Sequence, residues 1–184
     1  TPEDCSDGEL AALALGGRQS AYTALLARYR EPVFRVVRAT IGDDDAAVDV
    51  TQETFVSAFA ALKSYDSERS FKTWISRIAI NKCRDWARRR SVRRFFSFAL
   101  PIETAANVAD DTFTADKQIS DRAELARVQA AIATLPQAIR EPLVLRTIEG
   151  MTQAESAQVL GISEKAVETR LYRARAKLTE LLRV

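Results

Sequence analysis

The sequence contains no histidine among its 184 residues, and this absence removes several kinds of active site at once. Imidazole is the side chain most often used as a general base and as a zinc ligand, so histidine-based catalysis and most zinc sites are excluded. The two cysteines, Cys5 and Cys83, lie far apart and form no CxxC pair. They give no disulfide framework, which is typical of a reducing cytoplasm. We expect no metal, no cofactor and no catalytic residue.

Glycine, proline and long apolar runs are also scarce. Six glycines and five prolines leave few turn-forming residues, while Ala, Leu, Arg and Glu favour helices. No run of alternating β-branched residues predicts a strand. No apolar run approaches the roughly 18 residues that cross a bilayer, and the acidic start of the chain lacks the basic end of a signal peptide. The predicted fold class is all-α, and the expected location is the cytoplasm, with no direct membrane insertion.

The net charge of +2 says little about partners, but the charges are unevenly distributed. Residues 84–94 carry six arginines and one aspartate, and residues 163–184 carry six basic residues against three glutamates. Between them, residues 103–124 hold six acidic and two basic residues. Two separated basic patches are typical of two contacts with a polyanion. Solvated helix faces are the alternative for either patch alone.

Apolar residues that recur every three or four positions predict helices in a first unit. One helix kinks or restarts at Pro32 and ends at Gly42. The aspartates at 43–45 predict the cap of a second helix, which reaches about residue 65. A polar turn at 65–70 leads into a third helix. The face that the second helix is expected to bury consists of Val48, Thr51, Phe55, Ala58, Phe59 and Leu62.

Residues 91–119 lose the helical period and are interpreted as a linker before a second helical unit. In the second unit, Pro142 is placed in the first turn of a helix if that helix starts late. The predicted organisation is therefore a small helical domain at 1–95, a flexible linker at 96–119 and another small helical domain at 120–184. The apolar residues of the linker, expected to pack back on the first domain, are Phe95, Phe96, Phe98, Leu100 and Ile102.

The most specific pattern lies at residues 152–178. Thr152 and Glu155 have the spacing of a capping box, Gly161 supplies a sharp turn, and Ser163 caps the next helix. This pattern predicts a helix-turn-helix whose second helix enters the major groove of DNA with a basic outer face. An αα-hairpin in an ordinary bundle is the alternative. The positions expected to point inward are Val167, Leu171, Ala174 and Leu178.

Aromatic and basic residues are mixed in the third helix, at 71–90. Aromatic rings stack on unpaired bases while arginines contact phosphates, so this composition suits single-stranded or melting DNA. Phe71 and Trp74 also have the spacing of core residues, which is the competing interpretation.

Three segments together resemble the sigma-70 family of bacterial RNA polymerase sigma factors, of the extracytoplasmic-function type. DVTQETFVSAF at 49–59 is similar to the core-polymerase-binding helix of that family. FKTWISRIAINKCRDWARRR at 71–90 resembles its promoter −10 segment, and residues 135–178 resemble its −35-binding domain. The resemblance implies region 2-like and region 4-like domains.

The resemblance also implies a role for each matching residue. The turn at 65–70 would hold a flipped −10 base, and the linker would thread towards the channels of the polymerase. Contacts with the polymerase β′ subunit would come from Asp49, Gln52, Glu53 and Phe55. Contacts with the −10 strand would come from Asn81, Arg84, Arg88 and Arg89. Contacts with the −35 element would come from Ser163, Lys165, Glu168, Thr169, Arg170 and Arg173.

The function implied by the resemblance is promoter-specific initiation of transcription, with catalysis left to the polymerase. Such a protein is not an enzyme. Its partners would be core RNA polymerase (the β′ and β subunits) and promoter DNA. When free it would be a monomer, controlled by a membrane-associated anti-sigma factor in response to stress or another signal.

Two residues depart from the family pattern. Ser156 stands where the family has a larger aliphatic residue, which predicts looser packing of the first helix of the motif. Glu168 is acidic where a basic or small residue is common, so it either accepts a hydrogen bond from cytosine N4 or lowers the affinity for phosphate.

The alternative function is an autonomous helix-turn-helix regulator that binds operator DNA as a symmetric dimer. No clear dimerisation heptad supports it. An enzyme acting on nucleic acid is a third class, but the sequence has no histidine and no GxxxxGK phosphate loop. The aspartates at 43–45 are explained more simply as a helix cap than as a metal site.

Overall fold

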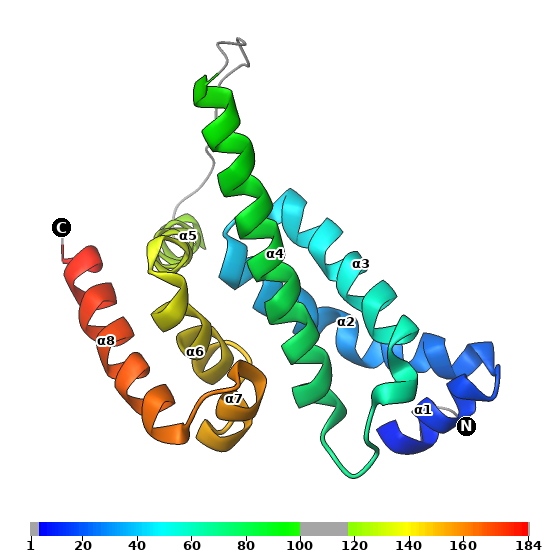
Figure 1. Ribbon diagram of the computed structural model, residues 1–184. Helices are drawn as coiled ribbons and strands as arrows, with labels where there is room; N and C mark the ends of the chain where they lie inside the picture. The colour runs from blue at the N-terminus through cyan, green and yellow to red at the C-terminus, as the bar shows by residue number, and fades with distance from the viewer. Residues whose placement is uncertain (1–3, 100–117, 184) are drawn as a thin grey trace.

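A computed structural model describes the backbone of residues 4–99 and 118–183 and the side chains of residues 4–97 and 122–183. All regular structure in these ranges is helical, which confirms the predicted fold class (Figure 1). Over the same ranges, none of the helices has the length and apolar character required to cross a membrane. The helices are α1 (Asp7–Leu15), α2 (Gln19–Ile41), α3 (Asp44–Ala60), α4 (Phe71–Ala99), α5 (Gln118–Thr134), α6 (Gln137–Thr147), α7 (Gln153–Leu160) and α8 (Glu164–Leu182), with a 3-10 turn, η1, at Leu62–Ser64.

α2 is one continuous helix of 23 residues that runs through Pro32. A proline inside a helix removes one backbone hydrogen bond. Here the apolar side chains on both sides of the proline, including Leu25 and Val37, are buried in one core, and this packing keeps the two halves in line. The helix ends at Gly42, whose φ of 68° is in the left-handed region. Asp43 then caps α3 by accepting a hydrogen bond from the Ala46 amide at 3.0 Å, as predicted.

α1 to α4 enclose a first hydrophobic core. The predicted inward face of α3 is wrong at Val48, which is exposed, whereas Val50 and Thr54 are buried. A threonine can occupy this core because its hydroxyl is satisfied locally: Thr54 Oγ1 donates to the Val50 carbonyl at 2.7 Å. Thr51, Phe55 and Ala58 are buried as predicted, so the buried face overlaps the predicted one and is turned slightly towards Val50 and Thr54.

α4 extends through Ala99, past the point where the sequence loses its helical period. Its end projects beyond the other helices in Figure 1. Phe95 and Phe96 are 73% and 60% exposed, so the prediction that they pack back on the first domain is wrong. The helix continues past the last residues that its neighbours cover, which leaves these rings in solvent. The side chains of Phe98, Leu100 and Ile102, and most of the predicted linker, lie outside the described residues.

α5 to α8 build a second core that is continuous with two residues of the first unit. Val36 of α2 and Ile80 of α4 are fully buried within this second core. α4 packs on α7, and α2 packs on α5 and α6, so α4 lies between the two groups of helices (Figure 1). Pro142 is buried within α6, which begins at Gln137, and therefore does not lie in the first turn. Leu125 of α5 is 57% exposed and takes no part in this core.

Candidate nucleic-acid interface

α7, a tight turn and α8 form the predicted helix-turn-helix. The capping box at the start of α7 is complete: Glu155 Oε2 accepts from the Thr152 amide at 2.7 Å, and Thr152 Oγ1 accepts from the Glu155 amide at 3.1 Å. The bond from the Thr152 backbone amide lowers the pKa of the Glu155 carboxyl. Gly161 ends α7 with a φ of 66°, and Ser163 Oγ caps α8 by accepting from the Ala166 amide at 3.1 Å.

α8 has one buried face and one polar face. Val167, Leu171 and Ala174 are buried and Leu178 is partly buried, as predicted. Five residues proposed for the −35 element are exposed, while Arg170 is half-buried at the edge of the same polar face. This face therefore presents a continuous polar surface. The five exposed residues are Ser163, Lys165, Glu168, Thr169 and Arg173.

Glu168 forms an ion pair with Lys165 one turn earlier, with Nζ and Oε2 2.8 Å apart. Both side chains are exposed, so the pair adds little to stability. The pair changes the charge of this surface, because the Glu168 carboxylate offsets one of the positive charges on the exposed face of α8. Glu168 therefore competes with a phosphate for the Lys165 ammonium.

The residues proposed for the −10 strand lie on α4. Asn81 is exposed and accepts a hydrogen bond from Arg84 Nη1 at 3.3 Å. Arg88 is paired with Asp85 at 3.0 Å. Neighbouring Arg90 lies over the Trp86 ring, with its guanidinium carbon 5.0 Å from the ring centroid. α4 therefore places arginines beside Trp86. Phe71 is buried and Trp74 packs against the first core, which favours the core interpretation for these two rings.

Arg84 has a second partner that the sequence did not predict. Its Nε and Nη2 donate to the two carboxylate oxygens of Glu141 on α6, at 2.9 and 2.6 Å. These hydrogen bonds raise the pKa of Arg84, and a parallel pair of this kind is among the strongest polar contacts in proteins. The sequence signal was limited to an acidic residue directly before the apolar run 142–145 of α6.

The residues proposed to bind the polymerase lie on α3, but they are not equally accessible. Asp49 and Gln52 are exposed, and Glu53 is half-buried. Phe55 is only 5% exposed and packs in the first core against Phe59. It is positioned to hold the shape of α3 and presents almost no surface to a partner. Glu53 in turn forms an ion pair with Arg89 of α4 at 3.3 Å.

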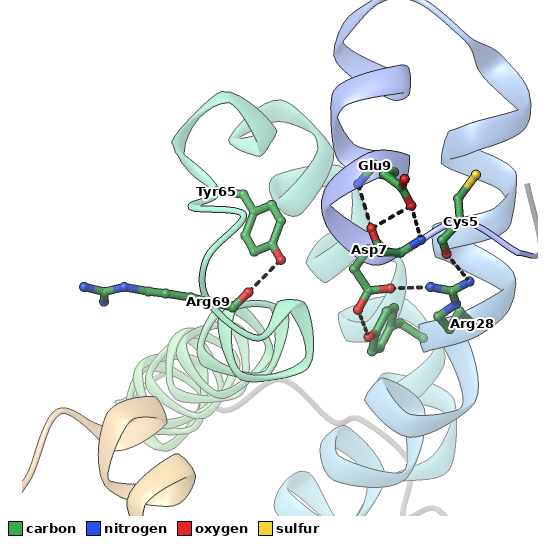
Figure 2. Close-up of polar contacts among 8 residues, drawn as sticks. Cys5, Asp7, Glu9, Arg28, Tyr65 and Arg69 are labelled. Carbon is green, nitrogen blue, oxygen red and sulfur yellow. Dashed lines mark hydrogen bonds and ion pairs between the residues drawn. The ribbon is translucent and has the colours of Figure 1, made fainter.

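The turn at 65–70 lies opposite the start of α1, across an open depression of about 530 Å³ (Figure 2). Tyr65 donates its hydroxyl to the Arg69 carbonyl at 2.7 Å, which shapes the turn. On the other side, Asp7 of α1 accepts from Arg28 and from the Tyr29 hydroxyl, both at 2.5 Å. Burial and the bond to Asp7 raise the pKa of Tyr29. The contribution of α1 to this depression is a feature that sequence reasoning missed.

Comparisons with known proteins agree with this geometry. Residues 25–93 match the family model Sigma-70 region 2, and residues 125–178 match Sigma-70, region 4. The chain is 44% identical to the RNA polymerase sigma factor CnrH of Cupriavidus metallidurans, over 98% of this chain and 96% of that protein. It is 31% identical to the ECF RNA polymerase sigma factor SigM of Mycobacterium tuberculosis, over 96% of this chain and 85% of that protein.

A solved structure also resembles the whole chain. The structure of CnrH in complex with the cytosolic domain of CnrY matches with a TM-score of 0.71 and 38% sequence identity. The match covers 96% of each chain, so both groups of helices are included.

Proposed function

This chain belongs to the sigma-70 family of RNA polymerase sigma factors, and we propose that it directs core RNA polymerase to promoters as a sigma factor of the extracytoplasmic-function type. The polar face of α8 carries the proposal. Residues proposed for the −35 element share that face, while apolar residues hold the opposite face against α6 and α7. This is the arrangement by which a recognition helix enters a major groove.

The remaining surfaces supply the other contacts of initiation. Asp49, Gln52 and Glu53 of α3 form the face offered to the β′ subunit, supported from within by Phe55. The −10 strand is bound by α4 through Asn81, Arg84, Arg88 and Arg89, and the β subunit completes the core enzyme. Each DNA contact is modest alone, but attachment to the polymerase raises its effective concentration at the promoter.

Chemistry in this scheme belongs to the polymerase, so the chain acts as an initiation factor and not as an enzyme. It works in the cytoplasm, where its polymerase is found, and is a monomer when free. The predicted domains at 1–95 and 120–184 correspond to the −10 and −35 functions.

Control by an anti-sigma factor is part of the same proposal. The similar protein CnrH was solved in complex with the cytosolic domain of CnrY. We extend this arrangement to the present chain: its inhibitor is membrane-associated and binds through a cytosolic segment.

The decisive experiment is transcription in a purified system. Core RNA polymerase is incubated with a promoter library, with and without the chain, and the transcripts are sequenced. We expect initiation from a defined subset of promoters only when the chain is present. The double variant R170A/R173A should lose most of this activity, while R122A, which removes an exposed arginine on α5, should retain it.

The autonomous regulator makes the opposite prediction in this assay. It would leave initiation unchanged, bind no core polymerase, and shift duplex DNA alone as a dimer. That result would reject the sigma factor assignment for this chain.

A further inference from the structure

Two glutamates of the second unit are buried although carboxylates are costly to remove from water. The side chain of Glu141 on α6 is 2% exposed, and that of Glu149, after α6, is 4% exposed. A charge in such a place persists only when it is paired and hydrogen-bonded. The residues that pair with these carboxylates therefore indicate the structural role of the two glutamates.

Among residues 4–97 and 122–183, every ion-pair partner of these two glutamates belongs to the first unit. Glu141 accepts two hydrogen bonds from Arg84, and Glu149 is paired with Lys72 at 3.2 Å and Arg35 at 3.3 Å. Lys72 Nζ also donates to the backbone carbonyl of Glu149 at 2.9 Å. The pairs thus join the two units and do not stabilise either unit alone.

The two contact points are far enough apart to fix an orientation. Lys72 and Arg84 are separated along α4 by roughly 18 Å at the helical rise per residue. Between them, Ile80 of α4 is buried in the core of the second unit, together with Val36 of α2. We call this packing of α5, α6 and α7 on α2 and α4 the closed arrangement.

The closed arrangement affects the two proposed DNA surfaces differently. The polar face of α8 stays exposed, since α8 packs only on α5, α6 and α7 among the main helix contacts. On α4, in contrast, Glu141 accepts from Nε and Nη2 of Arg84 and neutralises its charge, so a phosphate has to compete with a buried carboxylate for this guanidinium. Glu149 likewise neutralises Lys72 and Arg35 on the same side of the first unit.

We propose that the closed arrangement is an autoinhibitory latch, in which Glu141 and Glu149 occupy cations that the −10 strand needs, so that the two units must separate before this strand binds. The inference rests on the proposed function, because it takes Arg84 as a promoter contact. It adds Lys72 and Arg35 to the cations available to the DNA backbone in the open form. The promoter strand favours the open form because only that form offers these cations.

The first test measures the shape of the full-length chain without polymerase, by small-angle X-ray scattering. A compact chain of 184 residues has a radius of gyration of roughly 16 Å. E141R places two cations opposite each other, and we expect it to increase the radius relative to wild type. The swapped pair R84E/E141R restores opposite charges and should return the radius to the wild-type value. E124R makes the same charge change at an exposed position on α5 and should leave the radius unchanged.

The second test measures binding of a fluorescent single-stranded DNA of mixed sequence by anisotropy. The apparent affinity scales with the fraction of open chains, so we expect E141R to bind about tenfold more tightly than wild type. E124R controls for the added positive charge. An E141R chain with a wild-type radius would overturn the latch. An expanded E141R chain that binds no better than E124R would overturn the masking of the −10 surface.

Two controls keep the result interpretable. If circular dichroism shows that E141R is not folded, E141Q removes the charge while keeping the size of the side chain, and the same increases are expected in smaller measure. Wild-type chain with core polymerase tests the proposed function separately. Loss of promoter-specific initiation there would reject the sigma assignment, whereas failure of the latch alone changes only the radius and DNA affinity of the polymerase-free chain.

Discussion

Ser156 is completely buried in α7, and its hydroxyl has no hydrogen-bond partner among the described residues. The sequence predicted looser packing at this position because the side chain is small. The structure shows a different defect, since a buried polar group without a partner lowers the stability of the fold.

Replacing Ser156 with alanine should therefore stabilise the protein. We expect S156A to raise the free energy of unfolding by about 1 kcal/mol, because the unsatisfied hydroxyl is removed at little cost in packing. Urea denaturation followed by circular dichroism measures the change. S163A is the matched control: Ser163 Oγ caps α8, so its loss should lower the unfolding free energy by about 1 kcal/mol. A lower stability for S156A would show that the hydroxyl has a partner in solution.

The caps of the helix-turn-helix were the features best predicted from the sequence. Thr152, Gly161 and Ser163 act on backbone groups within a few residues, so their spacing alone determines the caps. The inward face of α8 was also predictable, because its apolar residues follow one helical stripe. These local features determine most of the structure of the helix-turn-helix.

Features that depend on distant parts of the chain were not predictable. Whether Val48 or Val50 is buried depends on how α3 is rotated against α2 and α4. The exposure of Phe95 depends on where neighbouring helices stop. Glu141 looks like a surface residue until α4 brings Arg84 to it. In each case the deciding contact lies far away in sequence.

The junction between α2 and α3 gives a prediction about packing between elements. Gly42 has a φ of 68°, and a Cβ built there would lie 2.4 Å from Cβ of Ala133 in α5. G42A therefore combines backbone strain of about 1 kcal/mol with a collision across the two units. We expect a larger loss of thermal stability than in G17A, which has a φ of 88° but no neighbour within 4 Å. Equal losses in the two variants would mean that α5 does not pack on α2 in solution.

At the scale of the whole molecule, the reactivity of Cys83 reports on the contact between the units. Cys83 is buried, and it lines a small cavity with Arg84, Arg140 and Glu141. Burial, followed by the nearby charge of Glu141, raises the pKa of the thiol to about 12. Very little thiolate, the reactive form, is then present at pH 8.

In a C5S background, Cys83 should react with a thiol reagent at pH 8 about a hundredfold more slowly than in the urea-unfolded chain. Opening of the closed arrangement removes α6 from the cavity and also removes the charge of Glu141. E141R should therefore react faster than wild type, and E124R should not. The absorbance of the released thiol product measures both rates. Identical rates for E141R and wild type would show that the first unit alone protects Cys83.

The ion pair between Glu53 and Arg89 joins a residue proposed to meet the polymerase with one proposed to meet the promoter. In suppressor genetics, substitutions at either residue would therefore be expected to affect both polymerase recruitment and promoter recognition. A charge-reversing allele at Glu53, isolated for weak recruitment, would also carry a promoter phenotype, because Arg89 loses its support. Its compensating allele would map to α4 and not to a polymerase gene. If both proposed roles hold, recruitment and promoter recognition are expected to depend on each other through this pair of side chains.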